Sequence, residues 1–354
     1  MTSSSFDIPK TTREYHLHKT TGFHDLTLET APVPLPKEGE VLVKVYAVSL
    51  NFRDLVIARG GSPLPGKPSV IPGSDCAAKI VLTGSATSKF KPGDRVSPNF
   101  ALDHVYGPPT EATKATGLSG EIDGVLGEYR VFPEHSLVRI PDYLSYEEAS
   151  TLPCAALTAY NALTGSGQPL KAGDTILVQG TGGVSIFAIQ IAHAAGATII
   201  ATSSSDEKLK ISRALGAAHT INYKKFPDWE KEVIKLTNGE GVDHVVEIGG
   251  PATWMKSLEA LKYGGYLHVV GAQAGLADVR MMVMPIIQKA LNLHGVQVGS
   301  RTQFEALNRH LAASNVHPVI DKIFDFEQTQ EAYEYVAKQG HVGKVVIRLF
   351  KDDQ

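Results

Sequence analysis

A glycine-rich segment, QGTGGVS at residues 179–185, carries the strongest chemical signal in this chain. It follows a β-branched run and precedes a long apolar helical pattern, so it lies at a predicted strand-to-helix junction. Gly180 can make the sharp turn, and Gly182 lets the backbone approach a bound anion. The N–H groups of the helix N-terminus can then bind a phosphate. The pattern predicts the pyrophosphate loop of a dinucleotide site, with a glycine turn in an ordinary sheet as the alternative.

The residues at the end of the second predicted strand indicate which dinucleotide binds. Proteins that bind NAD usually place an acidic residue about 20 positions after the glycines, where it bonds to the ribose 2′-hydroxyl. This chain has Thr202, Ser203, Ser204 and Ser205 there, with Lys208 one turn later. Hydroxyls and an ammonium can bind a 2′-phosphate, which a carboxylate would repel. The segment favours NADPH over NADH. Alternatively, Ser204 and Ser205 simply cap the next helix.

The elements that must position these residues fall into two groups. Up to about residue 139 the chain consists of short β-rich runs separated by Gly, Pro and Asp, which indicates an antiparallel, partly open barrel. From residue 145 onward, β-branched runs alternate with amphipathic helices, which predicts a doubly wound parallel sheet. We therefore predict an α/β protein with a β-barrel domain over 1–144, to which 301–354 return, and a Rossmann NADPH-binding domain over 145–300.

Composition and charge exclude several classes of protein. The 354 residues include 34 basic and 37 acidic side chains with no block of like charge, so we expect neither nucleic acid nor a membrane surface as a partner. Cys76 and Cys154 lie far apart, which excludes a disulfide framework and a four-cysteine zinc lobe. The N-terminal segment lacks an apolar signal sequence, and no run reaches the roughly 18 apolar residues of a membrane span. We expect a cytoplasmic protein.

Several segments, in the same order, resemble the medium-chain dehydrogenase/reductase superfamily, and within it the zinc-independent quinone oxidoreductase-like branch. The resemblance covers nearly the whole chain. It implies a GroES-like catalytic domain formed by both ends of the chain, a Rossmann domain inserted between them with the cofactor in the cleft, and a homodimer paired through the LHGVQVGS strand. The segments are SLNFRDLVIARG, IPGSDCAAKIV, FKPGDRV, LPCAALTAYNAL, VQGTGGVSIFAIQIA, ALGAAHTINY, HGVQVGSR and GHVGKVVI.

The resemblance also implies that no metal takes part. Zinc-dependent relatives supply a cysteine where this chain has Asn51 and a histidine where it has Ser74, whereas their third ligand, a cysteine, aligns with Cys154. A catalytic zinc needs three protein ligands and an open position. With one of the three ligands present, we expect no metal site, and we interpret Cys154 as a small buried apolar residue.

Cofactor-binding roles follow from the same resemblance, residue by residue. Asn51 resembles an asparagine near the nicotinamide ribose, and Gly343 and Lys344 resemble a glycine-lysine pair near the nicotinamide. A structural role is the alternative at each position, such as a turn for Asn51 or a solvated charge for Lys344. The complete predicted set is Asn51, Thr158, Gly180, Thr181, Gly182, Gly183, Val184, Ser203, Ser204, Lys208, Tyr223, Gly271, Gly343 and Lys344.

The predicted chemistry also needs a source of protons. Hydride addition to an enone or quinone produces an enolate-like oxyanion, which must be protonated. Some enoyl-reducing relatives place a tyrosine where this chain has Ser62, so the usual donor is missing and solvent or another side chain must replace it. The candidate catalytic residues are Asn51, Arg53 and Tyr106, of which Arg53 could stabilise negative charge and Tyr106 lies in a variable loop.

Together these patterns predict a zinc-independent, NADPH-dependent oxidoreductase that transfers hydride to an α,β-unsaturated carbonyl or quinone. The expected substrate is a small hydrophobic molecule. One alternative is a metal-free carbonyl reductase or alcohol dehydrogenase. Another is a catalytically inactive NADPH-binding protein with a structural or partner-binding role.

Overall fold

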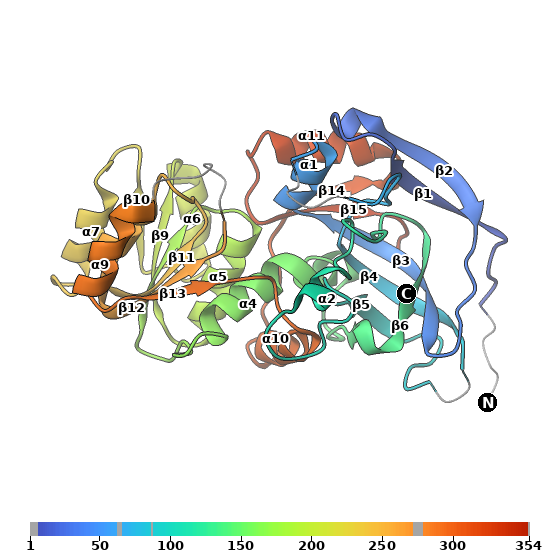
Figure 1. The fold of residues 1–354 in the computed structure, drawn as a ribbon, viewed down its shortest axis with the longest axis horizontal. Coiled ribbons are helices and arrows are strands. Elements are labelled where there is room, and N and C mark those ends of the chain that lie inside the picture. The colour runs from blue at the N-terminus through green and yellow to red at the C-terminus, as the bar shows by residue number, and fades with distance from the viewer. Residues whose placement is uncertain (1–5, 62–65, 86–87, 272–278, 353–354) are drawn as a thin grey trace. The chain divides into compact units, whose positions relative to one another are not determined.

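The chain folds into two compact units, which we call the barrel unit and the parallel-sheet unit (Figure 1). This computed structural model describes residues 6–61, 66–85, 88–271 and 279–352. The barrel unit comprises Met1–Cys154, Gly299–Ala312 and His317–Gln354, and the parallel-sheet unit comprises Ala155–Val298 and Ala313–Val316. None of the helices in the described residues is long and apolar enough to span a membrane.

The parallel-sheet unit contains one sheet of six parallel strands in the order β10-β9-β8-β11-β12-β13. This is the order of a Rossmann sheet, in which the direction of winding reverses between the first and fourth strands. The predicted α/β fold class is confirmed. The strands are β8 (Thr175–Gln179), β9 (Thr198–Ser203), β10 (His219–Asn222), β11 (Val242–Glu247), β12 (Leu261–Val269) and β13 (Asn292–Gly295).

Helices follow most of these strands, and apolar side chains from both pack into a continuous core. The helix after β8 begins at the glycine loop and is apolar over most of its length, because it is buried against the sheet. The helices of this unit are α4 (Leu157–Thr164), α5 (Gly183–Ala194), α6 (Asp206–Ala214), α7 (Trp229–Leu236), α8 (Trp254–Ala260), the 3₁₀ turn η4 (Val279–Met282) and α9 (Val283–Gln288).

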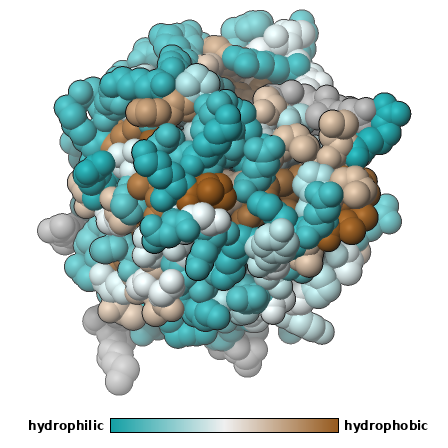
Figure 2. Space-filling model, turned by 90° about the vertical axis from the view of Figure 1, so that its left-hand side faces the viewer, coloured by the Kyte–Doolittle hydropathy of each residue, from teal (hydrophilic) through white to brown (hydrophobic). Residues whose placement is uncertain are grey.

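One surface of the parallel-sheet unit exposes several large apolar side chains. Met281 and Ile287 are each 66 % exposed, and Met284 and Leu293 are also exposed. They lie on η4, α9 and β13, so they flank the outer edge of the sheet. Hydrophobic side chains interrupt an otherwise hydrophilic surface in the view onto this end of the molecule (Figure 2). An exposed apolar patch beside the edge strand of a sheet is typical of an association surface.

Three histidines lie side by side on neighbouring strands of the same sheet. His244 Nδ1 is 3.0 Å from His268 Nε2, and His268 Nδ1 is 3.2 Å from His294 Nδ1. Burial lowers the pKa of His244 and His294 and holds that of His268 well below its usual value. A neutral imidazole donates through one nitrogen and accepts through the other, so neutral rings can form this chain of hydrogen bonds. We refer to these residues as the histidine chain.

The barrel unit contains a seven-stranded sheet with the order β14-β15-β3-β4-β5-β7, in which β6 also pairs with β3. All pairs are antiparallel except β14 with β15, and β1 and β2 form a separate antiparallel pair. The strands are β1 (Thr11–Leu17), β2 (Leu26–Pro32), β3 (Glu40–Leu50), β4 (Asp75–Thr83), β5 (Arg95–Pro98), β6 (Tyr129–Pro133), β7 (Leu137–Arg139), β14 (Ile320–Asp325) and β15 (Lys344–Arg348).

Short helices connect the strands of the barrel unit. Helix α1 begins directly after the longest strand, β3, and this junction places Asn51 at the end of the sheet. The helical segments are η1 (Phe23–Asp25), α1 (Phe52–Ala58), α2 (Glu111–Lys114), η2 (Glu134–Ser136), α3 (Tyr146–Ala149), the π-helical turn η3 (Leu152–Ala156), α10 (Arg301–Ala313), η5 (Phe326–Gln328) and α11 (Thr329–Ala337).

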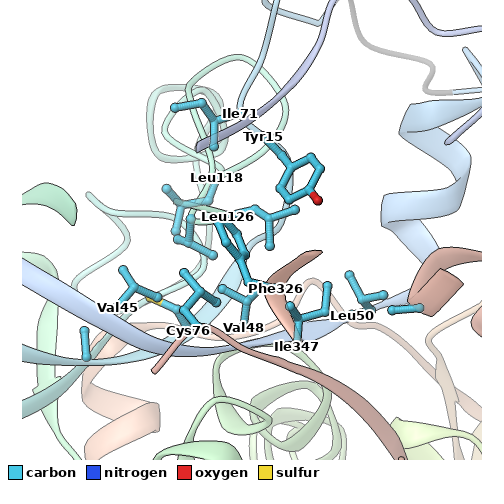
Figure 3. Packing of buried hydrophobic residues seen from close by; sticks show 14 of the residues in the cluster. Tyr15, Val45, Val48, Leu50, Ile71, Cys76, Leu118, Leu126, Phe326 and Ile347 are labelled. Carbon is cyan, nitrogen blue, oxygen red and sulfur yellow. The ribbon is translucent and has the colours of Figure 1, made fainter. Parts of the chain in front are cut away.

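The core of the barrel unit joins segments from both ends of the sequence. Val45 and Val48 of β3 pack with Cys76 of β4, Phe326 and Ile347, all of them buried (Figure 3). Because residues beyond 317 supply part of this core, the C-terminal segment is an integral layer of the unit. Burial also raises the pKa of the Cys76 thiol, which therefore packs as an apolar side chain.

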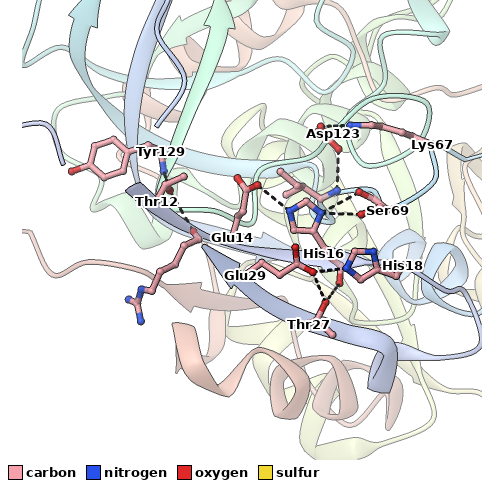
Figure 4. A network of polar contacts seen from close by, with 12 residues as sticks. Thr12, Glu14, His16, His18, Thr27, Glu29, Lys67, Ser69, Asp123 and Tyr129 are labelled. Atoms are coloured by element: carbon pink, nitrogen blue, oxygen red, sulfur yellow. Dashed lines mark hydrogen bonds and ion pairs between the residues drawn. The ribbon is translucent and has the colours of Figure 1, made fainter. Parts of the chain in front are cut away.

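A polar network holds the surface loops of the barrel unit (Figure 4). Asp123 accepts hydrogen bonds from the Lys67 ammonium and from the backbone N–H of Ile71, the latter at 3.1 Å. Burial acts to raise the pKa of Asp123, but the hydrogen bonds from Lys67 and Ile71 lower it overall. His16 joins a neighbouring loop by contacting Ser69 at 3.2 Å. These contacts show that partly buried carboxylates in this chain are stabilised by well-placed donors.

Candidate functional site

The glycine loop has the geometry that the sequence predicts. Gly180 has a φ of +74°, a left-handed conformation that favours glycine, and it turns the chain directly after β8. Gly182 is the N-cap of α5, and a Cβ at this position would meet no atom within 4 Å. Ser185 stands where the common pattern has a third glycine, and its hydroxyl donates to the carbonyl of Gln179 at 2.7 Å. The helix is thereby tied to the strand while its N-terminal N–H groups stay accessible.

Beside this loop lies a cavity of about 390 Å³ at the carboxyl ends of the strands. In parallel α/β sheets ligands bind at these ends, next to the point where the strand order reverses. The size is in the range of small-molecule sites, which is about 300–1,000 Å³. Its lining residues are Gln179, Gly180, Thr202, Tyr223, Pro227, Trp229, Ile248, Gly249, Ala252, Thr253 and Lys256.

A buried carboxylate, Glu247, holds two of the lining residues, Gln179 and Thr253, by hydrogen bonds. Its Oε2 accepts hydrogen bonds from Gln179 Nε2, at 2.8 Å, and from the Ser257 hydroxyl. Its Oε1 accepts from the Thr253 hydroxyl, at 2.6 Å, and from the Gly250 N–H, at 3.0 Å. Gln179 links the strand ends further, because its Oε1 accepts from the backbone N–H of Gly249 at 3.3 Å. Neutral donors therefore surround the carboxylate and fix the ends of β8 and β11 together.

The serine segment lies at the end of β9 and starts the next helix. Ser203 is buried, and its hydroxyl accepts the N–H of Ser205 at 3.4 Å. Ser205 is the N-cap of α6 and accepts the N–H of Lys208 at 3.4 Å. The nearest acid, Asp206, bonds to Asn222 at 2.8 Å and pairs with Lys225 at 2.6 Å, and hydrogen bonds from these two residues lower its pKa. The capping alternative thus holds for Ser205, while Ser204 stays beside the cavity-lining Thr202.

A second group of predicted residues meets in the barrel unit. Lys344, on β15, is only 3 % exposed, and its ammonium donates to the carbonyl of Leu50 at 2.6 Å and to Asn51 Oδ1. Asn51 Nδ2 lies 3.4 Å from the hydroxyl of Ser74, which donates to Asp75 Oδ1 at 2.7 Å. Strands far apart in the sequence therefore bring Asn51 and Lys344 into direct contact.

The same cluster continues through buried acidic groups. Asp75 Oδ2 accepts the N–H of Cys154 at 3.1 Å, and burial raises the pKa of the Cys154 thiol to about 12. Asp54 Oδ2 accepts the backbone N–H of Asn51 at 2.7 Å in a capping-box arrangement, whereas its Oδ1 has no hydrogen-bond partner among the described residues. Burial raises the pKa of Asp54 to about 6, although the Arg53 guanidinium, 3.8 Å from that oxygen, opposes the rise.

The remaining catalytic candidates of the barrel unit do not all join this cluster. Arg53 donates to the carbonyl of Leu118 at 3.0 Å, and its guanidinium lies over the ring of Phe100. Tyr106 is 77 % exposed, and no contact described for it links it to Asn51 or Arg53. Ser62 lies outside the described residues. Of the predicted catalytic residues, Asn51 and Arg53 thus lie near the buried Asp54, and Tyr106 is exposed.

Most of the other predicted cofactor residues lie next to the end of a strand. Gly271 follows β12, and a Cβ there would lie 2.3 Å from the carbonyl oxygen of Ile248, so only glycine permits this approach. Gly343 has a φ of +73°, and its Cβ would meet the carbonyl oxygen of Val319 at 2.3 Å. Tyr223 lines the cavity, whereas Thr158 is buried in α4. Thr181, Gly183 and Val184 lie in the loop and the first turn of α5.

Several residues at the cavity are absent from the predicted set. Gln179, Trp229 and Lys256 line the cavity, and the buried Glu247 bonds to Gln179. The sequence places Gln179 and Glu247 at the ends of two predicted strands, which is the only local signal they carry. Their contact depends on β8 and β11 being neighbours, and strand order is a property of the tertiary fold. Trp229 and Lys256 lie on helices α7 and α8, and their sequence environment does not distinguish them from ordinary helical residues.

Family models and related sequences agree with this architecture. Residues 37–142 match the alcohol dehydrogenase GroES-like domain, and residues 183–314 match the zinc-binding dehydrogenase domain. A zinc-type alcohol dehydrogenase-like protein of Schizosaccharomyces pombe is 44 % identical over 93 % of this chain and 96 % of its own length. Acryloyl-coenzyme A reductase of Metallosphaera sedula is 30 % identical (89 % and 93 % covered), and human quinone oxidoreductase is 29 % identical (90 % and 91 % covered).

Solved structures also match along almost the whole chain. A putative alcohol dehydrogenase from Sinorhizobium meliloti superposes with a TM-score of 0.89 at 40 % identity, covering 97 % of this chain and all of that one. A 2-octenoyl-CoA carboxylase reductase, solved with NADP and 2-octenoyl-CoA, superposes with a TM-score of 0.83 at 26 % identity, covering 96 % and 88 % of the two chains.

Proposed function

We propose that this chain, which belongs to the medium-chain dehydrogenase/reductase superfamily and is an oxidoreductase, is a zinc-independent, NADPH-dependent reductase. Its proposed substrates are conjugated carbonyl compounds or quinones. The single observation that carries the proposal is the contact of Lys344 with Asn51, at a position where zinc-dependent relatives carry a metal ligand. The related quinone oxidoreductase and acryloyl-coenzyme A reductase bear names that fit this substrate class.

The glycine loop and the adjoining cavity support a bound dinucleotide. The accessible N–H groups at the start of α5 can bind a pyrophosphate, and the helix dipole favours its negative charge. No carboxylate stands at the end of β9, where Thr202 and Ser203 end the strand. Ser204 and Lys208 supply a hydroxyl and an ammonium for a 2′-phosphate. When bound, the reduced dinucleotide supplies the hydride.

The donor set of the Asn51 cluster is a poor match to a catalytic zinc. Asn51 and Ser74 are neutral and stand at two of the three ligand positions, so only Cys154 offers a group that zinc commonly binds. The Lys344 ammonium beside Asn51 is a positive charge that would repel a second cation. Among the described residues, no group of three or more His, Cys, Asp and Glu side chains is placed to hold a metal ion. These features support chemistry without a metal.

The exposed apolar patch supports a homodimer. Met281, Met284 and Ile287 lie beside the unpaired edge of β13, and a second copy of that edge could extend the sheet. Light scattering should give twice the mass of the chain, and Ile287→Asp, which places a charge in the patch, should shift the protein toward monomer. A monomer in the unsubstituted protein would contradict this proposal.

A substrate screen tests the reductase proposal directly. We expect NADPH absorbance to fall in the presence of an enone, enal, enoyl thioester or quinone, with unchanged rate when a chelator is added. Loss of activity with the chelator would contradict the zinc-independent assignment. Tight NADPH binding without turnover on any of these compounds would instead favour the inactive binding protein.

An alternative function is reduction of a carbonyl to an alcohol, because the relatives from S. pombe and S. meliloti are described as alcohol dehydrogenase-like. Product analysis separates the two reactions. Reduction of an enone at its C=C bond gives a saturated ketone, whereas reduction at C=O gives an allylic alcohol. The allylic alcohol as the main product would favour the alternative.

Cofactor preference has its own test. Lys208→Ala is expected to weaken NADPH binding by about tenfold, which corresponds to about 1.4 kcal/mol, while NADH binding changes little. Lys256→Ala is the matched control, because this ammonium lines the cavity but is held by the carbonyl of Pro227 and by Glu230, 3.4 Å away. The control should affect both dinucleotides equally. A higher affinity for NADH in the unsubstituted protein would contradict the interpretation of the serine segment.

A further inference from the structure

A second cavity, of about 470 Å³, lies in the barrel unit. It is formed by the segment before β5, by β7 with the residues that follow it, and by one face of α10. This volume is in the range of small-molecule sites, which is about 300–1,000 Å³. None of the predicted catalytic or cofactor-binding residues lines this cavity, so the proposed reductase function leaves it unexplained.

One wall of this cavity is apolar. Phe90, Leu137 and Ile140 line it, and each of them is at most 5 % exposed. The guanidinium of Arg139 lies over the ring of Phe90, 4.7 Å from its centre, so a positive charge adjoins this wall. A molecule bound here would bury carbon against these side chains, which favours binding through the hydrophobic effect.

Basic side chains predominate among the charged residues of the lining. The basic residues are Lys89, Arg139, Arg301 and Arg309. Two of them have a carboxylate partner, because Arg139 pairs with Asp94 and Arg301 pairs with Glu305, each at 2.8 Å. Within the part of the chain that the structure describes, the other two form no ion pair. The cavity therefore carries an excess of positive charge.

These like charges lie close enough to affect one another. Partial burial and the positive charge of Arg301 lower the pKa of the Lys89 ammonium. Arg139 acts in the same direction, whereas Glu305 opposes the shift. Each of these cations disfavours the others, so an anion bound among them is attracted by all of them.

Two polar atoms of the lining residues are buried without a hydrogen-bond partner among the described residues, namely Arg301 Nε and Asn308 Oδ1. Asn308 is 8 % exposed, and its Nδ2 donates to the carbonyl of Arg139 at 2.9 Å, so the amide oxygen is left as an acceptor. Buried polar groups in folded proteins are nearly always hydrogen-bonded. A bound molecule with a polar end supplies partners of this kind.

We propose that this cavity is a binding site for an organic anion with an apolar body, such as a medium-chain carboxylic acid. The acid group pairs with the basic side chains, since guanidinium groups bind carboxylates through paired hydrogen bonds. The carbon chain packs against the wall around Phe90. The proposal concerns a further site and does not depend on the reductase function, because it involves neither the dinucleotide nor turnover.

Matched probes test the class of ligand. Calorimetric titration of the full chain compares octanoate with 1-octanol, which shares its carbon chain, and with acetate, which shares its acid group. We expect octanoate to bind at least about tenfold more tightly than either, and added salt to weaken octanoate but not octanol. Equal binding of octanol would show that charge plays no part, and equal binding of acetate would show the same for the apolar wall. Either result would overturn the proposal.

Removal of single charges locates the bound anion. Lys89→Ala and Arg309→Ala should each weaken octanoate binding about fivefold, the upper end for an exposed ion pair. Lys91→Ala is the matched control, because Lys91 is an exposed lysine of the same segment that does not line the cavity. It should change the affinity less than about twofold. Equal losses in all three variants, or no loss in any, would contradict the proposed site.

An added negative charge should have a larger effect. Ala312→Glu places a carboxylate in the lining at an exposed position of α10, so like-charge repulsion should weaken octanoate binding at least about tenfold. Ala313→Glu adds the same charge at the next position, which is exposed and outside the lining. The same affinity in both variants would show that octanoate binds elsewhere.

Addition of NADPH separates this site from the proposed dinucleotide site. We expect octanoate to bind equally well with and without saturating NADPH, and displacement by NADPH would overturn the proposal. The titrations require no turnover. Failure of octanoate to bind would therefore refute this inference alone, whereas failure to reduce any enone or quinone would refute only the reductase proposal.

Discussion

Two buried carboxylates, one in each unit, are stabilised in opposite ways. Glu247 of the parallel-sheet unit accepts four hydrogen bonds from neutral donors, which occupy both of its oxygens. Asp54 of the barrel unit lies near two cations, Arg53 and Lys344, but only one of its oxygens has a hydrogen-bond partner in the described part of the chain. Burial nevertheless raises the pKa of Asp54 to about 6.

The difference teaches that nearby positive charge does not replace hydrogen bonds for a carboxylate removed from water. Desolvation penalises the charged form, and a cation 3.8 Å away with imperfect geometry recovers only part of that cost. A complete shell of donors makes Glu247 a structural element of the cavity. Asp54 is instead a group whose charge changes in a mildly acidic pH range, directly beside Asn51.

The largest expected effect is on Glu247. Glu247→Leu leaves the Ser257 hydroxyl and the Gly250 N–H without an acceptor, whereas Gln179 keeps the Ser257 oxygen and Thr253 keeps the Gly250 carbonyl. Each unsatisfied buried group costs about 1–3 kcal/mol. We therefore expect the free energy of unfolding to fall by about 4 kcal/mol, measured by urea denaturation. Glu247→Gln, which keeps one acceptor oxygen, should lose about half as much. A loss below 1 kcal/mol in Glu247→Leu, a value expected of an exposed site, would break the comparison.

Asp54 should behave in the opposite way. Its folded-state pKa, about 6, lies above its ordinary value of 3.8, so the folded protein binds the proton more tightly and loses stability as the pH rises from about 4 to 6. Asp54→Asn keeps the acceptor for the Asn51 N–H and removes the buried charge. It should raise the free energy of unfolding by about 2 kcal/mol at pH 7 and have little effect at pH 4.

The matched control for Asp54 is Asp123, whose carboxyl has a lowered pKa. Its stabilising contribution is present above the ordinary pKa and is lost as the pH falls through the folded-state value. Asp123→Asn should therefore reduce stability at pH 7, opposite in sign to Asp54→Asn. If both variants change stability at pH 7 in the same direction, burial and hydrogen bonding do not explain the difference between these carboxyls.

The smallest effect concerns the histidine chain, where burial depresses the pKa of a base. Burial holds the pKa of His268 well below 6.5, so below pH 6.5 this side chain is protonated in the unfolded chain but stays neutral in the folded protein. The free energy of unfolding therefore decreases as the pH falls below 6.5. His268→Gln should remove about 1 kcal/mol of this loss between pH 6.5 and 5.5, as followed by thermal unfolding. His24→Gln, at a side chain that is 70 % exposed, should leave the slope unchanged. The same slope in all three proteins would show that His268 is not held neutral.

The sequence predicted the parts of the fold and site that depend on local patterns. Gly180 and Gly182 are recognisable because a turn and a helix start have their own residue preferences, and β-branched runs indicate parallel strands. The hydrogen bond between Glu247 and the cavity-lining Gln179 could not be predicted, because it depends on which strands are neighbours in space. Tyr106 was predicted as a catalytic candidate from its loop position, yet sequence does not reveal that its ring is 77 % exposed.

The pairing of Asn51 with Lys344 joins residues 293 positions apart. During synthesis, β3 and β4 are complete long before β15, which carries Lys344. Asn51 can therefore meet Lys344 only after β15 pairs with β3. A chain that ended before β15 would lack both this contact and the side chains that β15 adds to the barrel core.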